Sequence, residues 1–187
     1  DSSLLNETTR RKHLASDMVM ALEHNALELY YQPIVNLESG RCEAVEALLR
    51  WRHPELGFIP PNEVIQVAEE FQLAEKLGSW VLNTACEQLH QWQHLGLVDL
   101  QMCVNISPGM YQRNLLKLVA KALMEHHIPA SCLVLEVTED TTMREVKNSL
   151  QLMQDLSQQG VHLALDDFGT GYSSLSYLQK LPVSKVK

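Results

Sequence analysis

The stretch His162-Leu-Ala-Leu-Asp-Asp-Phe-Gly-Thr-Gly-Tyr-Ser-Ser174 decides the fold predicted for this chain. It begins as a short apolar run, reaches two adjacent carboxylates at Asp166 and Asp167, and then breaks into a glycine loop with a serine-rich helix start. Two like charges at a strand end repel each other, and glycine loses conformational entropy on folding. A divalent cation would offset the repulsion, so the stretch predicts a metal site at the carboxyl end of a parallel strand. A solvated acidic turn is the alternative for this stretch taken alone.

The rest of the chain alternates apolar runs with helical patterns. We expect strands at 27–35, 41–51, 100–106, 132–138, 161–167 and 183–187, and helices at 62–71, 77–95, 114–126, 144–159 and 173–179. Asn62 is the expected N-cap of its helix after a loop at 54–61, and Gly160 is the expected stop of the helix at 144–159. A lead-in helix before residue 25 would bury a weak apolar stripe that includes Leu14 and Met18, and Trp80 and Trp92 should pack a helix on the sheet. The connection at 36–40 is short, so the first two strands should form an antiparallel hairpin. The later strands are near-continuous apolar runs, which is typical of a parallel sheet covered on its faces. This order predicts an α/β fold, most simply a (β/α)8 TIM-like barrel with an antiparallel first strand.

The composition bounds the class of protein. A length of 187 residues predicts one domain, and 45% hydrophobic with 20% charged residues is ordinary for a globular chain. The net charge of -8 argues against binding a nucleic-acid polymer but leaves a small anionic substrate open. No apolar run reaches the roughly 18 residues that span a bilayer, so no membrane contact is expected from this segment. The four scattered cysteines predict free thiols in a reducing compartment rather than disulfides or zinc.

Polar residues interrupt the predicted strands near their carboxyl ends. They are Glu46, Asn105, Glu136 with Glu139, Asp166 with Asp167, and Lys187. In a barrel these strand ends meet at one face, where active sites lie, so we expect the side chains to converge. Carboxylate and amide oxygens favour Mg²⁺ or Mn²⁺ over Zn²⁺, and this number of carboxylates suggests two ions, as in phosphodiester hydrolysis. Each residue alone could instead be a surface acid, a cap or a solvated tail. His90 and His94 are expected on a helix surface.

The motifs resemble those of the EAL domain, the bacterial phosphodiesterase that hydrolyses cyclic di-GMP. The triplet that names the family is Glu46-Ala47-Leu48. The other matching motifs, in the family order, are Tyr31-Gln-Pro-Ile34, Val104-Asn-Ile-Ser107, Leu135-Glu-Val-Thr-Glu139, Asp166-Asp-Phe-Gly-Thr-Gly-Tyr-Ser-Ser-Leu175, and Leu181-Pro-Val183 with Lys187. The resemblance begins near Leu14, so residues 1–13 are expected to be a linker and residues 14–187 the N-terminal portion of an EAL domain.

The resemblance implies a role for each matching site residue. It implies two Mg²⁺ or Mn²⁺ ions held by Glu46, Asn105, Glu136, Asp166 and Asp167. Lys187 would be catalytic and position the water, and Gln32, Leu48 and Arg50 would contact the substrate, with Arg50 at a phosphate. Glu139 would anchor the loop at 167–174, which the family links to metal binding and to dimer formation. The product would be linear pGpG.

The sequence departs from the family pattern in one respect, because it stops inside the sixth predicted strand. The family's general-base glutamate comes after that point, so we expect this segment to belong to a longer protein and to turn over little substrate by itself. Sensory or GGDEF-type domains are the expected additions, and a homodimer is the expected assembly. A receptor that binds cyclic di-GMP without cutting it is the alternative function. The expected location is the cytoplasm, with any tether to the inner membrane supplied by other regions.

Overall fold

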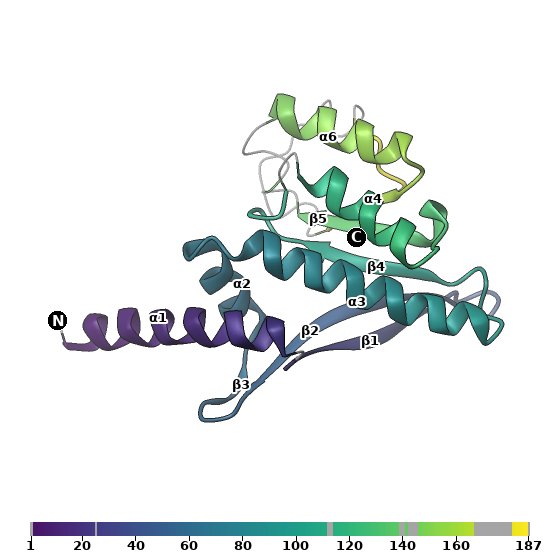
Figure 1. The fold of residues 1–187 in the computed structure, drawn as a ribbon. Helices are drawn as coiled ribbons and strands as arrows, with labels where there is room; N and C mark the ends of the chain where they lie inside the picture. The colour runs from purple at the N-terminus through teal and green to yellow at the C-terminus, as the bar shows by residue number, and fades with distance from the viewer. Residues whose placement is uncertain are drawn as a thin grey trace.

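The computed structural model describes residues 2–24, 26–111, 114–138, 141, 146–166 and 181–186. In this part of the chain seven strands form one sheet, in the order β1-β2-β4-β5-β6-β7, with β3 paired to β2 (Figure 1). The strands are β1 (Leu27–Val35), β2 (Cys42–His53), β3 (Gly57–Ile59), β4 (Gln101–Ile106), β5 (Leu133–Thr138), β6 (His162–Asp166) and β7 (Lys185–Val186).

The sheet combines an antiparallel edge with a parallel remainder. β1 and β3 run antiparallel to β2, whereas β2, β4, β5, β6 and β7 are parallel to one another. The parallel strands follow one another in chain order, as they do in the wall of a (β/α) barrel. The predicted α/β fold with an antiparallel first strand is therefore confirmed. Pro33 lies in β1, which is an edge strand among the described residues, so no further described strand needs the N–H that proline lacks.

The helices described are α1 (Ser2–Glu23), α2 (Pro61–Glu70), α3 (Ala74–His94), α4 (Leu115–Glu125) and α6 (Val146–Gln158), with a short 3-10 turn at Ala130–Cys132. In Figure 1, α3, α4 and α6 follow one another over the same side of the sheet, and α3 contacts α4 as α4 contacts α6. Within the described residues, none of these helices combines the length and the apolar composition that crossing a bilayer requires.

The predicted ends of the helices agree with the structure at Gly160 but not at Asn62. The predicted stop at Gly160 is confirmed, because its φ of +90° is a conformation that glycine adopts at little cost. The predicted N-cap at Asn62 is wrong: Pro60 caps α2, and Pro61 opens it because the first helical position needs no N–H. The segment expected as a loop at 54–61 contains β3, which is too short to show a periodic pattern. The helix predicted at 173–179 lies outside the described residues.

The main core lies between the sheet and the helices. Large side chains that are almost completely buried there include Trp51, Met102, Leu133, Leu135 and Leu156. Trp92 of α3 meets Tyr31 of β1 edge-on with ring centroids 5.0 Å apart, which confirms the helix-to-sheet role predicted for this tryptophan. A second, smaller cluster occupies the opposite face of the sheet and consists of Ala44, Cys103, Val134 and Ala164.

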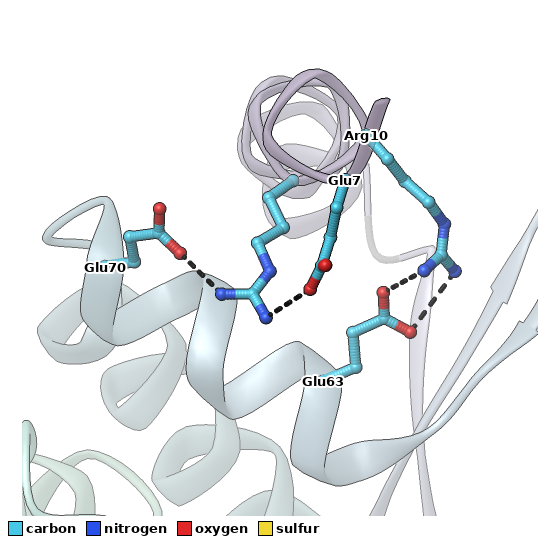
Figure 2. A network of polar contacts seen from close by, with 5 residues as sticks. Glu7, Arg10, Glu63 and Glu70 are labelled. Atoms are coloured by element: carbon cyan, nitrogen blue, oxygen red, sulfur yellow. Dashed lines mark hydrogen bonds and ion pairs between the residues drawn. The ribbon is translucent and has the colours of Figure 1, made fainter. Parts of the chain in front are cut away.

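Helix α1 is longer than the lead-in helix that the sequence suggested. It begins at Ser2, so residues 2–13, expected to be a linker, are helical; the domain boundary at residue 14 stays a prediction. Leu14 and Met18 are completely buried, as the predicted apolar stripe requires. Figure 2 shows the polar side of the same interface, where Arg10 pairs with Glu63 of α2. Arg11 joins Glu70 of α2 at 3.2 Å and Glu7 of its own helix at 2.9 Å.

The cysteines are free thiols, as predicted. Cys42 is exposed, whereas Cys86, Cys103 and Cys132 are buried. Burial raises the pKa of the Cys86 thiol to about 12, so this thiol stays protonated and unreactive at neutral pH.

Candidate functional site

One face of the sheet carries the acidic and amide residues predicted for the site. Successive side chains of a strand point to opposite faces, so residues two apart share a face. Each member of the small apolar cluster is followed, two residues later, by a predicted ligand: Ala44 by Glu46, Cys103 by Asn105, Val134 by Glu136 and Ala164 by Asp166. The four polar residues therefore line the same face of four neighbouring strands, one step nearer to the carboxyl ends.

Glu46 and Asn105 are in direct contact. The Nδ2 atom of Asn105 donates a hydrogen bond to Oε1 of Glu46 over 2.8 Å, which links β2 to β4. Because the amide nitrogen is turned toward Glu46, the amide oxygen Oδ1 is the atom that Asn105 can offer to a cation. Asn105 is exposed, so this oxygen can be reached from solvent.

Glu136 and Asp166 continue the row on β5 and β6. Glu136 lies opposite Asn105 in the β4–β5 register, and its side chain is almost completely buried, with 2% exposure. Asp166 is half-buried at the end of β6, opposite Thr138. A carboxylate as buried as that of Glu136 is costly unless hydrogen bonds, an opposite charge or a cation compensate it. Three carboxylates and one amide oxygen along one face match the ligands that Mg²⁺ and Mn²⁺ prefer.

The described residues place part of the predicted ligand set. Among them, no three His, Cys, Asp or Glu side chains converge closely enough to hold a metal ion. Asp167, Glu139 and Lys187 lie outside the described residues, so the structure does not locate these three predicted side chains. The contact between Glu46 and Asn105 is thus the best-defined part of the candidate site.

The residues predicted to contact substrate lie on the same face, toward the edge of the sheet. Gln32 of β1 is opposite Glu46 of β2, and Leu48 and Arg50 follow Glu46 at intervals of two. Gln32 is exposed, and Leu48 and Arg50 are partly exposed. The row of acids therefore continues into a stretch with an amide, an apolar side chain and a guanidinium, which suits a ligand with polar, apolar and anionic parts.

The sequence reasoning missed two contacts, one on this face and one at the loop after β4. Tyr30 stands two residues before Gln32, and its ring lies 5.5 Å from the guanidinium carbon of Arg50. The spacing of two was the available signal for Tyr30. Glu69 of α2 accepts a hydrogen bond over 2.9 Å from the backbone N–H of Gly109 and ties the loop after β4 to the helix. No local pattern indicates this contact, because 40 positions separate the two residues.

A cavity of about 310 Å³ lies elsewhere, between α1 and the end of β2. Its polar groups are engaged with one another: Nε2 of His53 lies 2.9 Å from Oδ2 of Asp17, and Nδ1 of His53 accepts from the backbone N–H groups of Glu55 and Leu56. Because Nδ1 accepts, Nε2 carries the proton and donates to Asp17. We interpret the contact between Asp17 of α1 and His53 of β2 as structural, because it links the helix to the strand. The predicted surface histidines His90 and His94 are on α3 with ring centroids 4.2 Å apart.

Comparison with known proteins places the chain in a family. Residues 15–187 match the model of the EAL domain. The bifunctional diguanylate cyclase/cyclic di-GMP phosphodiesterase MucR of Pseudomonas aeruginosa is 42% identical over 188 residues, which cover 100% of this chain and 27% of MucR. The cyclic di-GMP phosphodiesterase NbdA of the same organism is 38% identical over 185 residues, which cover 98% of this chain and 24% of NbdA. The chain thus spans about a quarter of the length of these relatives.

The fold agrees with the same family. A solved structure of the MucR phosphodiesterase in complex with cyclic di-GMP has a TM-score of 0.88 and 43% identity to this chain, and the match covers 93% of this chain and 71% of that one. The prediction of an EAL-type, TIM-like barrel fold is confirmed. On the combined agreement of family model, sequence and fold, this chain belongs to the EAL domain family.

Proposed function

We propose that this domain hydrolyses cyclic di-GMP to linear pGpG with two divalent cations, Mg²⁺ or Mn²⁺. The observation that carries the proposal is the row of Glu46, Asn105, Glu136 and Asp166 on one face of four adjacent strands, with Asn105 bonded to Glu46. The similarity to MucR, whose phosphodiesterase has been solved with cyclic di-GMP, supports the choice of substrate. Asp167 would complete the ligand set from outside the described residues.

The donor set suits hard cations. The carboxylates and the Asn105 oxygen are all oxygen ligands, and several carboxylates in a row exceed what one Mg²⁺ normally takes from a protein. When bound, a pair of such ions supplies an activated water and stabilises the entering and leaving oxygens of a phosphodiester. The protein itself contributes rigid placement, because the four described ligands are fixed on hydrogen-bonded strands rather than on loops.

The neighbouring residues bind and orient the substrate in this proposal. Arg50 presents forked N–H donors that match two oxygens of a phosphate. Gln32 offers an amide to a base or ribose, and Leu48 provides an apolar contact. Lys187 would position the water, and Glu139 would anchor the loop at 167–174; both lie outside the described residues.

Assembly and location form part of the same proposal. We infer a homodimer formed through the region after Asp167, and attachment to further sensory or GGDEF-type domains, since MucR is bifunctional and is much longer than this chain. A cytoplasmic location fits the free thiols, because a reducing compartment keeps an exposed cysteine such as Cys42 unpaired. Sedimentation of the purified protein over a range of concentrations tests the dimer.

Incubation of the full protein with cyclic di-GMP and Mg²⁺, with pGpG followed by chromatography, tests the activity. We expect product from the wild-type protein, and none from Glu46→Gln or from samples treated with a chelator. Binding of cyclic di-GMP in a calorimeter without formation of pGpG would support the receptor alternative and contradict hydrolysis. Absence of both binding and product would contradict the substrate assignment itself.

A further inference from the structure

An exposed aromatic ring lies on the face that carries the candidate site. Tyr30 is opposite Leu48 in the antiparallel pairing of β1 and β2, and Gln32 follows it on the same face. The tyrosine is 50% exposed although its ring is large and mostly apolar. By contrast, the next residue, Tyr31, points to the other face and packs on Trp92. The exposure of Tyr30 is therefore not explained by packing of the core.

The ring of Tyr30 holds a neighbouring cation. Arg50 is the diagonal neighbour of Tyr30 across the strand pair, a separation that long side chains can bridge. Its guanidinium carbon lies 5.5 Å from the centroid of the ring, and its Nη1 donates to the carbonyl of Leu49 over 2.8 Å. An arginine side chain has many rotamers, and these two contacts favour the one that lies over the strand.

Arg50 keeps its positive charge free for a ligand because its described side-chain partner is an aromatic ring and not a carboxylate. Glu28 is opposite Arg50 in the register, but the ion pairs found among the described residues do not join Arg50 to a carboxylate. A carboxylate partner would compete with a phosphate for the same N–H donors. The aromatic ring accepts none of these N–H groups in a carboxylate-like ion pair, so the donors other than the one that Nη1 gives to Leu49 stay available to a phosphate.

We propose that Tyr30 is a positioning residue that holds the guanidinium of Arg50 in place for a phosphate of the substrate without neutralising it. The identity of that substrate, cyclic di-GMP, rests on the proposed function. The ring acts through Arg50, because ordering the arginine before binding reduces the entropy lost when the phosphate docks. Removing the ring should therefore weaken substrate binding and leave the chemical step unchanged.

Two substitutions at position 30 and one elsewhere test the proposal. Tyr30→Leu keeps the apolar volume but removes the ring, and Tyr30→Phe keeps the ring. Leu37→Ala is the control, because it removes an exposed apolar side chain in the β1–β2 turn, at the opposite end of β2 from Arg50. Calorimetry with cyclic di-GMP and a chelator measures binding to the full protein without turnover. We expect binding about two- to five-fold weaker for Tyr30→Leu, and about equal to wild type for the other two variants. With Mg²⁺, KM should rise by the same factor while kcat stays constant.

A double-mutant cycle separates positioning from a general effect on the fold. In an Arg50→Gln background, Tyr30→Leu should cause no further loss of binding, because the ring would have no guanidinium to hold. An equal loss in both backgrounds, or wild-type affinity in Tyr30→Leu alone, would overturn the proposal while leaving the proposed function intact. A wild-type protein that neither binds nor cuts cyclic di-GMP would overturn both together.

Discussion

Asn105 and Glu46 are joined by a hydrogen bond of 2.8 Å although 59 positions separate them in the chain. The bond connects two adjacent parallel strands, β2 and β4, on the face where Glu46 and Asn105 follow the small apolar cluster by two positions. It places a carboxylate and an amide oxygen side by side, which is the arrangement that a shared cation requires. Substitutions at this pair should therefore separate the stability of the sheet from the binding of metal.

Asn105→Asp should make the protein dependent on metal for stability. The substitution puts a second carboxylate beside Glu46, and the repulsion should lower the free energy of unfolding by about 1 kcal/mol without metal. Thermal melts in chelator and in excess Mg²⁺ measure this, and Mg²⁺ should raise the melting temperature more in the variant than in wild type. Asn105→Leu, which adds no charge, should show no such gain with Mg²⁺. Equal melting temperatures of Asn105→Asp and wild type in chelator would contradict this account.

Glu136→Gln should remove metal binding and leave the fold unharmed. Glutamine keeps the shape of this buried side chain but not its charge, so we expect the metal-free free energy of unfolding to stay within about 1 kcal/mol of wild type. The stabilisation that Mg²⁺ gives to the wild-type protein should disappear, together with hydrolysis. Urea unfolding with and without Mg²⁺ measures both quantities. Glu38→Gln, at an exposed position in the β1–β2 turn, is the control and should respond to Mg²⁺ as wild type does.

Alkaline pH should destabilise the protein through Cys86. Burial raises the pKa of this thiol from 9.0 to about 12, so the unfolded chain loses the proton first. Between those two values the unfolded state binds fewer protons, and stability should fall as pH rises, by about 1.4 kcal/mol per pH unit. Burial also raises the pKa of Tyr31 from 10.0 to about 12, which adds to the upper part of this window.

Substitution of Cys86 measures its share of the alkaline loss. We expect urea midpoints of Cys86→Ala to fall less steeply with pH than those of wild type, even if the variant is less stable at every pH. Cys42→Ala, at an exposed thiol, serves as the matched control and should keep the wild-type slope. If the urea midpoints of Cys86→Ala and wild type fell equally steeply with pH, the Cys86 thiol would not be the cause of the loss of stability at alkaline pH.

Apolar burial, more than ion pairing, should hold α1 on the domain. Met18 is completely buried, so Met18→Ala should lower the free energy of unfolding by about 2–5 kcal/mol. Arg10 is exposed and pairs with Glu63, so Arg10→Ala should cost less than about 1 kcal/mol. Urea unfolding of the two variants compares them directly. A larger loss for Arg10→Ala than for Met18→Ala would reverse the order of the two contributions.

The apolar pattern of the sequence was sufficient to predict the positions of most strands of the sheet. The strand predicted at 27–35 coincides with β1, and the strand predicted at 161–167 contains β6, because each is a bounded run of apolar or alternating residues. β3 could not be found in this way, since its three residues gain their conformation only by pairing with β2. The start of α2 was misplaced by one residue because Asn62 is a good N-cap, whereas the helix already begins at Pro61, a position that needs no N–H.

The candidate site was predictable at the level of residues and not at the level of contacts. Polar residues at successive strand ends indicated Glu46, Asn105, Glu136 and Asp166, and the alternation of side chains does put them on one face. Which of them touch depends on the strand register, and a single sequence does not specify it. The contact between Tyr30 and Arg50 also depends on a diagonal across two strands, so only the folded chain reveals it.

The central claim is that oxygens from separate strands of this sheet bind divalent cations. Titration of the metal-free protein with Mn²⁺, followed by electron paramagnetic resonance of the free ion, tests it most directly. We predict two bound ions per chain in the wild-type protein, and loss of the tight binding in Glu46→Gln and in Asp166→Asn. Mn²⁺ binding of wild-type affinity and stoichiometry in both variants would contradict the account.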